Sequence, residues 1–210
     1  YRRGISWYRK DLILDEKLKG RTLNLYFEGA NQVSDVYVNS VFVGQHKGGY
    51  TAFVVDITDY AKFGKDEPNL IAVQVNSSHD NEIPPLSVGY AMYGGIYRDV
   101  SLIASNPVHF KMSDHASNGI YVTTPNVSKK VASVTIDGTL INETNKTKSL
   151  TIISRILNMN GVQVSSTEST VEVYPGDESQ FQHIPGKIQN PKLWSPDDPY
   201  LYSVVSEIYE

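Results

Sequence analysis

The chain has 210 residues, with 19 Lys and Arg against 23 Asp and Glu, so its formal net charge at pH 7 is −4. A mildly acidic chain without basic runs gives no electrostatic footprint for nucleic acid, and no apolar stretch reaches the ~20 residues of a membrane span. The absence of cysteine excludes disulfides and thiolate metal sites, and it fits a bacterial protein or a reduced compartment.

The first half of the chain alternates apolar and polar residues with a period of two, which predicts β-strands. In 21–27, Leu23, Leu25 and Phe27 share one face. The run 36–43 predicts two short strands joined by a two-residue turn at Asn39-Ser40. The same pattern predicts further strands at 50–55, 70–75 and 96–103. In the last of these, Ile96, Val100 and Leu102 are expected to face inward beside Arg98.

Between two of these strands lie residues 76–93, about eighteen positions without a clear period. Loops longer than ~12–15 residues are uncommon in compact domains and are often functional. This loop contains Asp80 and Asn81, flanked by His79 and Glu82, and then a stiff Pro84-Pro85 pair. It is the best candidate for a ligand-facing loop in this half, although a solvated polar loop is the simpler interpretation of the His79–Glu82 cluster.

Turn residues at Ser105-Asn106-Pro107 predict a boundary between two domains, 1–106 and 107–210. Asn160-Gly161 is a strong hairpin signal in the second domain. Short strands with turns every 8–12 residues over about 100 residues indicate an immunoglobulin-like sandwich. The strands expected there are 119–123, 131–142, 150–158, 162–167, 170–174 and 200–209.

Catalytic constellations are not recognisable in the sequence. No glycine-rich phosphate loop or nucleophile elbow occurs, and the five histidines lack ligand spacing, so neither a metal nor a cofactor is expected. For Trp7 and Trp194, packing in the core or between domains is favoured over stacking on sugar rings. Arg98 is expected to be buried in an ion pair, with sugar contact as the alternative. Two β-sandwiches without a recognisable set of catalytic residues favour a binding or scaffold role.

Several runs resemble the N-terminal region of glycoside hydrolase family 2 enzymes, and they occur in the order in which that family has them. In the first half these runs are 4–10, 27–30, 36–40, 43–44, 48–53, 56–58, 69–73 and 94–100. In the second half, Leu193-Trp194-Ser195-Pro196 and Pro199-Tyr200-Leu201-Tyr202 are similar to the run that closes the family's immunoglobulin-like domain.

The resemblance implies an all-β chain, in which a jelly-roll (galactose-binding-like) sandwich precedes an immunoglobulin-like sandwich. In the family a (β/α)8 barrel follows and supplies both catalytic glutamates of a retaining hydrolase. This chain ends at Glu210, before such a barrel, so we expect it to be inactive alone and to need no cofactor. The implied partners are a carbohydrate substrate, most closely a β-galactoside, and the protein's own barrel. Homo-oligomerisation stays open, and export to the periplasm or medium is favoured over a cytoplasmic location.

Two positions depart from the family pattern. Asn39-Ser40 stands where Asn-Gly is usual, so Ser40 is expected to strain the turn modestly. In an ungapped count, Gly89 stands where galactosidase-like relatives have a sugar-contacting aspartate. The expected substrate-binding residues are therefore spread over the loop and its exit, with Asp80 as the substitute carboxylate. They are Asp80, Asn81, Tyr90, Tyr93 and Arg98.

A second hypothesis comes from another functional class. The same pair of sandwiches would suit a stand-alone carbohydrate-binding or adhesion module, which would bind galactosides measurably by itself. A third hypothesis assigns the second domain mainly to contacts between subunits.

Overall fold

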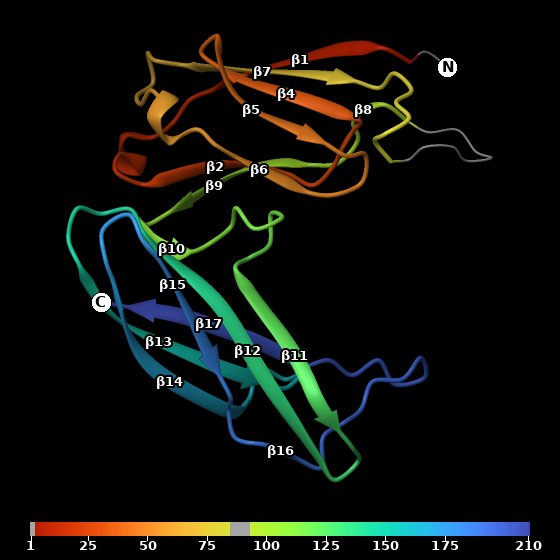
Figure 1. The fold of residues 1–210 in the computed structure, drawn as a ribbon, viewed down its shortest axis with the longest axis vertical. Helices are drawn as coiled ribbons and strands as arrows, with labels where there is room; N and C mark the ends of the chain where they lie inside the picture. Colours follow the sequence, from red (N-terminus) through yellow and green to blue (C-terminus); the bar gives the residue numbers. More distant parts are fainter. Residues whose placement is uncertain (1–2, 85–92) are drawn as a thin grey trace. The chain divides into compact units, whose positions relative to one another are not determined.

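The computed structural model describes residues 3–84 and 93–210, and these residues form antiparallel β-sheets (Figure 1). Within the described residues the helical elements are two short 3-10 helices, η1 (Glu16–Leu18) and η2 (Thr58–Tyr60). None of the helices in these ranges has the length or apolarity that a membrane crossing requires. The chain forms two compact units, one from Tyr1–Asn106 with Met112–Ala116 and the other from Pro107–Lys111 with Ser117–Glu210.

The first unit is a sandwich of a four-stranded sheet, in the order β1-β7-β4-β5, and a three-stranded sheet, in the order β6-β2-β9. A short pair, β3 with β8, lies at the end where β7 finishes (Figure 1). The strands are β1 (Ile5–Leu12), β2 (Thr22–Phe27), β3 (Ala30–Asn31), β4 (Val33–Val38), β5 (Val41–Lys47), β6 (Phe53–Asp56), β7 (Asn69–Asn76), β8 (Gly95–Ile96) and β9 (Val100–Ser105).

Alternation along the strands fixes which side chains fill this sandwich. In β7, every second residue from Asn69 to Val75 is buried, and its partners in β4 are buried with the same period. Phe27 and Phe53, paired on the neighbouring strands β2 and β6, stack at a ring-centroid distance of 4.5 Å, and the imidazole of His46 on β5 stacks on Phe53 at 4.3 Å. The core therefore follows from the period-two pattern that the sequence shows.

The turn between β4 and β5 confirms the predicted hairpin. Asn39 and Ser40 have φ of 51° and 71°, the two positive values that a type I′ turn requires. The Asn39 side chain also accepts a hydrogen bond from the Leu70 amide at 3.0 Å and donates to the Tyr60 carbonyl at 2.9 Å. Ser40 takes a left-handed conformation that favours glycine, which fits the modest strain expected at this position.

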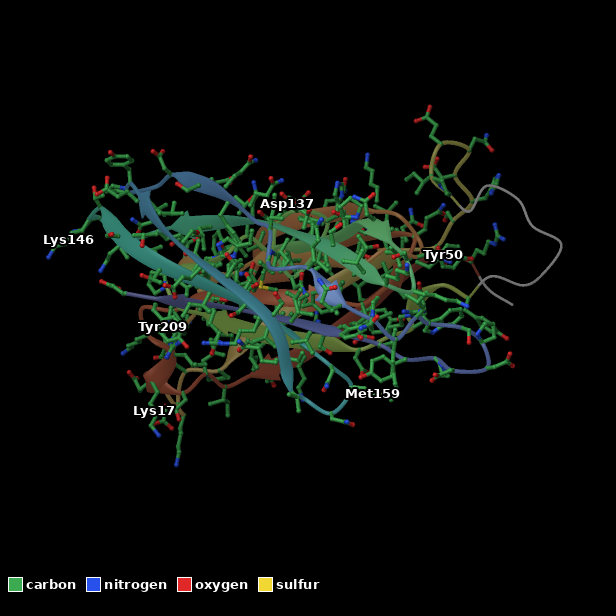
Figure 2. All side chains as sticks on the ribbon, turned by 90° about the horizontal axis from the view of Figure 1, so that it is seen from below. Lys17, Tyr50, Asp137, Lys146, Met159 and Tyr209 are labelled. Atoms are coloured by element: carbon green, nitrogen blue, oxygen red, sulfur yellow. The ribbon has the colours of Figure 1, made fainter. Side chains whose placement is uncertain are left out.

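The second unit is also a sandwich. In one sheet β12 pairs with β10, β11, β15 and β16, and the other has the order β14-β13-β17. The strands are β10 (Val108–Phe110), β11 (Ile120–Val127), β12 (Val131–Asn142), β13 (Lys148–Leu157), β14 (Gln163–Val173), β15 (Glu178–His183), β16 (Ile188–Gln189) and β17 (Ser203–Tyr209). Lys146 and Met159, in the loops before and after β13, mark its two ends in Figure 2.

The predicted split of 162–174 into two strands is wrong, because β14 runs unbroken from Gln163 to Val173. It pairs with β13 along nearly its whole length, with one register irregularity near Leu157. The sequence hides this continuity because most of β14 is exposed and its outward residues are Ser, Thr and Glu rather than a clear apolar alternation. Cross-strand pairing, which lies outside any local window, keeps the strand extended.

Of the two kinds of packing expected for the tryptophans, packing in a core is wrong, and packing between the domains stays a prediction. Trp7 is 53% exposed on β1, and Trp194 is 58% exposed in the irregular segment between β16 and β17. Trp7 instead contacts Tyr37, with ring centroids 5.7 Å apart. Both rings are therefore surface features of their units.

Candidate functional site

The loop that follows β7 is anchored at its first residue. The Ser77 amide donates to the Gly4 carbonyl at 2.9 Å, and the Gly4 amide donates to Ser77 Oγ at 3.2 Å. The next amide, of Ser78, donates to Asn76 Oδ1 at 3.0 Å. These bonds fix the point at which the chain leaves the sheet, so the loop begins from a rigid base.

Two buried amide side chains hold the two limbs of this loop. Asn31 and Gln32 are adjacent, 6% and 5% exposed, and joined by a cis peptide bond. Asn31 Nδ2 donates to the Tyr93 carbonyl at 2.8 Å, and Gln32 Nε2 donates to the Ile83 carbonyl. The Gln32 backbone amide also donates to the Asn76 carbonyl at 3.1 Å. A buried amide without partners would be costly, so these bonds position the loop from beneath.

The polar cluster at the start of the loop is bonded within itself. Asp80 Oδ1 accepts from the Glu82 amide at 2.7 Å, and His79 Nε2 lies 2.9 Å from Asn81 Oδ1. His79, Asn81 and Glu82 are exposed, and Asp80 is partly exposed. Within 3–84 and 93–210, no group of three or more His, Asp or Glu side chains is arranged to hold a metal ion.

The exit of the loop presents aromatic side chains to solvent. Tyr93 is 76% exposed, while its backbone is held by Asn31. Tyr97 Oη donates to the Gly49 carbonyl at 2.8 Å, and its ring lies 6.5 Å from that of the exposed Tyr50. Tyr50 is labelled in Figure 2. Tyr90 and Gly89 lie outside the described residues.

Arg98 is exposed, so the prediction of a buried, inward-facing arginine is wrong. The expected strand 96–103 is interrupted, because Tyr97, Arg98 and Asp99 lie between β8 and β9, and Val100 is exposed as well. The Asp99 carbonyl accepts from the Glu28 amide at 3.1 Å, one position beyond the last residue pair of β2 and β9. The Arg98 guanidinium carbon lies 5.8 Å from the Tyr97 ring centroid, so Arg98 borders the loop exit instead of the core.

Glycines allow the close approach of the segments that form this end of the sandwich. A Cβ on Gly94 would overlap Ser77 Cβ, and a Cβ on Gly95, which has φ of 92°, would overlap Tyr8 Oη. A Cβ on Gly29 would lie 2.7 Å from Tyr97 Oη. These positions explain why Gly94-Gly95 precedes the Ile96-Tyr97-Arg98 run.

The two halves of the chain match two domains of one protein family. Residues 2–107 match "Glycosyl hydrolases family 2, sugar binding domain", and residues 118–210 match "Glycosyl hydrolases family 2". The chain belongs to glycosyl hydrolases family 2. The fold agrees with this membership, since a jelly-roll sandwich precedes an immunoglobulin-like one.

Relatives in family 2 match almost the whole chain. The β-galactosidase of Thermoanaerobacter pseudethanolicus is 40% identical over 204 residues, covering 96% of this chain and 26% of that protein. The β-glucuronidase of Bacteroides fragilis is 34% identical over 211 residues, covering 100% of this chain and 30% of that protein. The crystal structure of Bacteroides uniformis β-glucuronidase superposes with a TM-score of 0.94 at 33% identity, covering 99% of this chain and 24% of that one. The chain thus spans about a quarter of the length of these family 2 proteins.

Sequence reasoning located the loop of this family 2 chain but missed what supports it. Asn31 and Gln32 were not singled out, although an amide pair directly after the Gly29-Ala30 run was a usable signal. Tyr97 and Tyr50 were likewise missed as a pair, because they are 47 positions apart and meet only through the fold. The described site offers hydrogen-bonding and stacking groups, which suit recognition of a hydroxyl-rich ligand.

Proposed function

We propose that the chain is the non-catalytic, sugar-facing front of a retaining glycoside hydrolase that acts on β-galactosides. The observation that supports this most strongly is the pair of family 2 matches over nearly the whole chain, which together correspond to about a quarter of each relative. In this proposal the catalytic barrel, with its acid/base and nucleophile glutamates, belongs to the remaining three quarters. Such hydrolysis proceeds between two carboxyl groups and requires no cofactor from this chain.

The role proposed for the loop is to complete the substrate site. Asp80 keeps lone pairs free besides the one that accepts from Glu82, so its carboxylate can accept from a sugar hydroxyl. Asn81, Arg98 and Tyr93 are exposed and offer an amide, a guanidinium and a stacking ring. Tyr90 is proposed as a second stacking ring. The second sandwich is proposed to pack on the barrel.

Galactoside is proposed over glucuronide on the strength of sequence identity. The β-galactosidase of T. pseudethanolicus is 40% identical to the chain, against 35% and 34% for two β-glucuronidases. The test is a panel of p-nitrophenyl glycosides assayed with the full-length parent protein. We expect the highest kcat/KM with the β-galactoside. A preference for the β-glucuronide would overturn the substrate assignment but not the enzyme class.

The binding-module hypothesis makes the opposite prediction for the isolated chain. As a stand-alone module, the 210-residue chain would bind galactosides by titration calorimetry, and its parent would hydrolyse no glycoside. As an enzyme's front part, the isolated chain has only one side of the site and should bind simple galactosides negligibly. Calorimetry with methyl β-galactoside beside the glycoside panel separates these two functions.

A further inference from the structure

The outer face of the β1-β7-β4-β5 sheet presents an unusual pair of neighbouring cross-strand rows. Residues paired across the strands form these rows because alternate side chains of a strand point to the same face. One row is Arg9, Ala72, Tyr37 and Phe42. The next is Trp7, Gln74, Asp35 and Gln45.

Three aromatic rings in these rows form a continuous strip, which we call the aromatic strip: Trp7 on β1, Tyr37 on β4 and Phe42 on β5. The Trp7 and Tyr37 ring centroids are 5.7 Å apart, and those of Tyr37 and Phe42 are 5.5 Å apart. Trp7 and Tyr37 meet diagonally across β7, whose residue in the Tyr37 row is the small Ala72. The two distances place the ring centroids of Trp7 and Phe42, at the ends of the strip, no more than about 11 Å apart.

Packing of the sandwich does not account for the aromatic strip. The inward faces of these strands supply the core through Val36, Val38 and Val73, all of which are buried. Trp7 and Phe42 are 53% and 51% exposed on the opposite side. The outer face of an antiparallel sheet is ordinarily polar, so clustered, contacting aromatics there indicate a binding surface.

The polar residues beside the strip decide what kind of ligand suits it. Gln45 Nε2 donates to Asp35 Oδ1 at 2.7 Å, so this amide–carboxylate pair is already oriented next to the rings. Gln74 lies between Trp7 and Asp35 in the same row. Within the two rows the charges of Arg9 and Asp35 cancel. These groups favour an uncharged ligand that is rich in hydroxyls and can lay apolar C–H faces on aromatic rings.

We propose that the aromatic strip binds a neutral glycan chain. The rings stack on the C–H faces of successive sugars, and the Gln45–Asp35 pair and Gln74 exchange hydrogen bonds with their hydroxyls. The tilts between the rings, 38° and 67°, suit a glycan whose sugars rotate along the chain more than a flat one. This surface uses none of the residues proposed for the loop, so it does not rest on the proposed function.

The test uses the 210-residue chain, after circular dichroism has shown that it folds, because its two tryptophans make the strip directly observable. A Trp194→Phe variant leaves Trp7 as the single tryptophan. We expect soluble β-1,4-galactan or hydroxyethylcellulose to retard this variant in affinity electrophoresis and to shift its Trp7 emission to shorter wavelength. Trp7→Ala and Phe42→Ala should each weaken binding about tenfold, the equivalent of one lost aromatic contact.

Trp194→Ala is the matched control, since it removes an equally exposed tryptophan from the second sandwich. It should bind like the unmodified chain, and circular dichroism should show that every variant is folded. The proposal is overturned if neither neutral glycan binds, if the folded Trp7→Ala, Phe42→Ala double variant binds normally, or if polygalacturonate binds better than both. A dimer in sedimentation that Trp7→Ala dissociates would also overturn it, because a second copy of the chain would then cover the strip.

Discussion

His183 on β15 is a buried histidine with a hydroxyl at each ring nitrogen. Its Nδ1 lies 2.9 Å from Ser154 Oγ and its Nε2 lies 2.8 Å from Ser169 Oγ, while the residue as a whole is 3% exposed. Ser154 Oγ in turn lies 2.8 Å from Ser206 Oγ. Burial lowers the pKa of the His183 imidazole below its ordinary 6.5. The neutral ring thus links strands of both sheets of the second sandwich.

This histidine predicts a loss of stability in mild acid. Because the pKa of His183 is lower in the folded chain, the unfolded chain binds more protons between the folded value and 6.5. The contribution of His183 to the free energy of unfolding therefore has its full value above pH 6.5. It decreases as the pH falls toward the pKa that His183 has in the folded chain. The melting temperature should be lower at about pH 5.5 than at about pH 7.5.

A His183→Gln variant tests the assignment. Its melting temperature should change less between the two pH values, whatever its absolute stability. Some dependence should persist, since burial also lowers the pKa of His46. An unchanged pH dependence in the variant would show that His183 does not titrate in this range.

Gly94 predicts a steric effect at the base of the loop. A Cβ there would overlap Ser77 Cβ, and Ser77 cannot move freely because it is bonded to Gly4. Gly94→Ala should lower the free energy of unfolding in urea by about 1–3 kcal/mol. Gly186→Ala is the control, since its Cβ would meet nothing closer than 3.4 Å. Partial recovery on adding Ser77→Gly is expected, and equal effects of Gly94→Ala and Gly186→Ala would contradict this account.

At the scale of elements, the loop after β7 depends on Asn31 of β3 and on Gln32, which lies between β3 and β4. Removing the Gln32 donor leaves the Ile83 carbonyl without this partner. The lost hydrogen bond should lower the stability of the loop by about 0.5–1.5 kcal/mol. Gln32→Leu should therefore raise hydrogen-exchange rates of the amides in 77–83 by up to about tenfold. Gln182→Leu, which breaks a bond to Asp137 in the second sandwich, should leave these rates unchanged. Unaltered exchange rates in Gln32→Leu would show that the loop keeps its conformation without the Gln32 hydrogen bond.

The strands that the sequence predicted well are those with one buried face. β12 was predicted at its exact bounds because its burial alternates without a break from Val131 to Asn142. The two-residue strands β3, β8 and β16 are too short to show a period, and they exist only through pairing with distant partners. The Arg98 prediction failed because the run 96–103 resembles one strand locally, whereas its first part, β8, pairs with β3 and its last part, β9, pairs with β2.

Of the candidate site, the sequence could locate the loop but not its supports or its exposed rings. Loop length and polar composition are local properties, whereas the Asn31–Tyr93 bond joins residues 62 positions apart. The exposure of Trp7 could not be predicted either. The alternation of a strand separates its residues into two faces, but it does not show which face is exposed to solvent.

At the scale of the whole molecule, two sandwiches carry family 2 motifs in order, and the described loop offers recognition groups. The order of the motifs was sufficient to identify the family, since the family matches cover residues 2–107 and 118–210. The motif order does not identify the sugar in the same way. Relatives named β-galactosidase and relatives named β-glucuronidase both match nearly the whole chain.

In the proposed function, the chain supports hydrolysis without performing it. The most direct measurement is release of p-nitrophenol from the aryl β-galactoside by the isolated 210-residue chain and by its full-length parent at equal concentration. We predict turnover by the parent and none above buffer by the isolated chain. Turnover by the isolated chain, or a parent that hydrolyses no aryl glycoside, would contradict the claim.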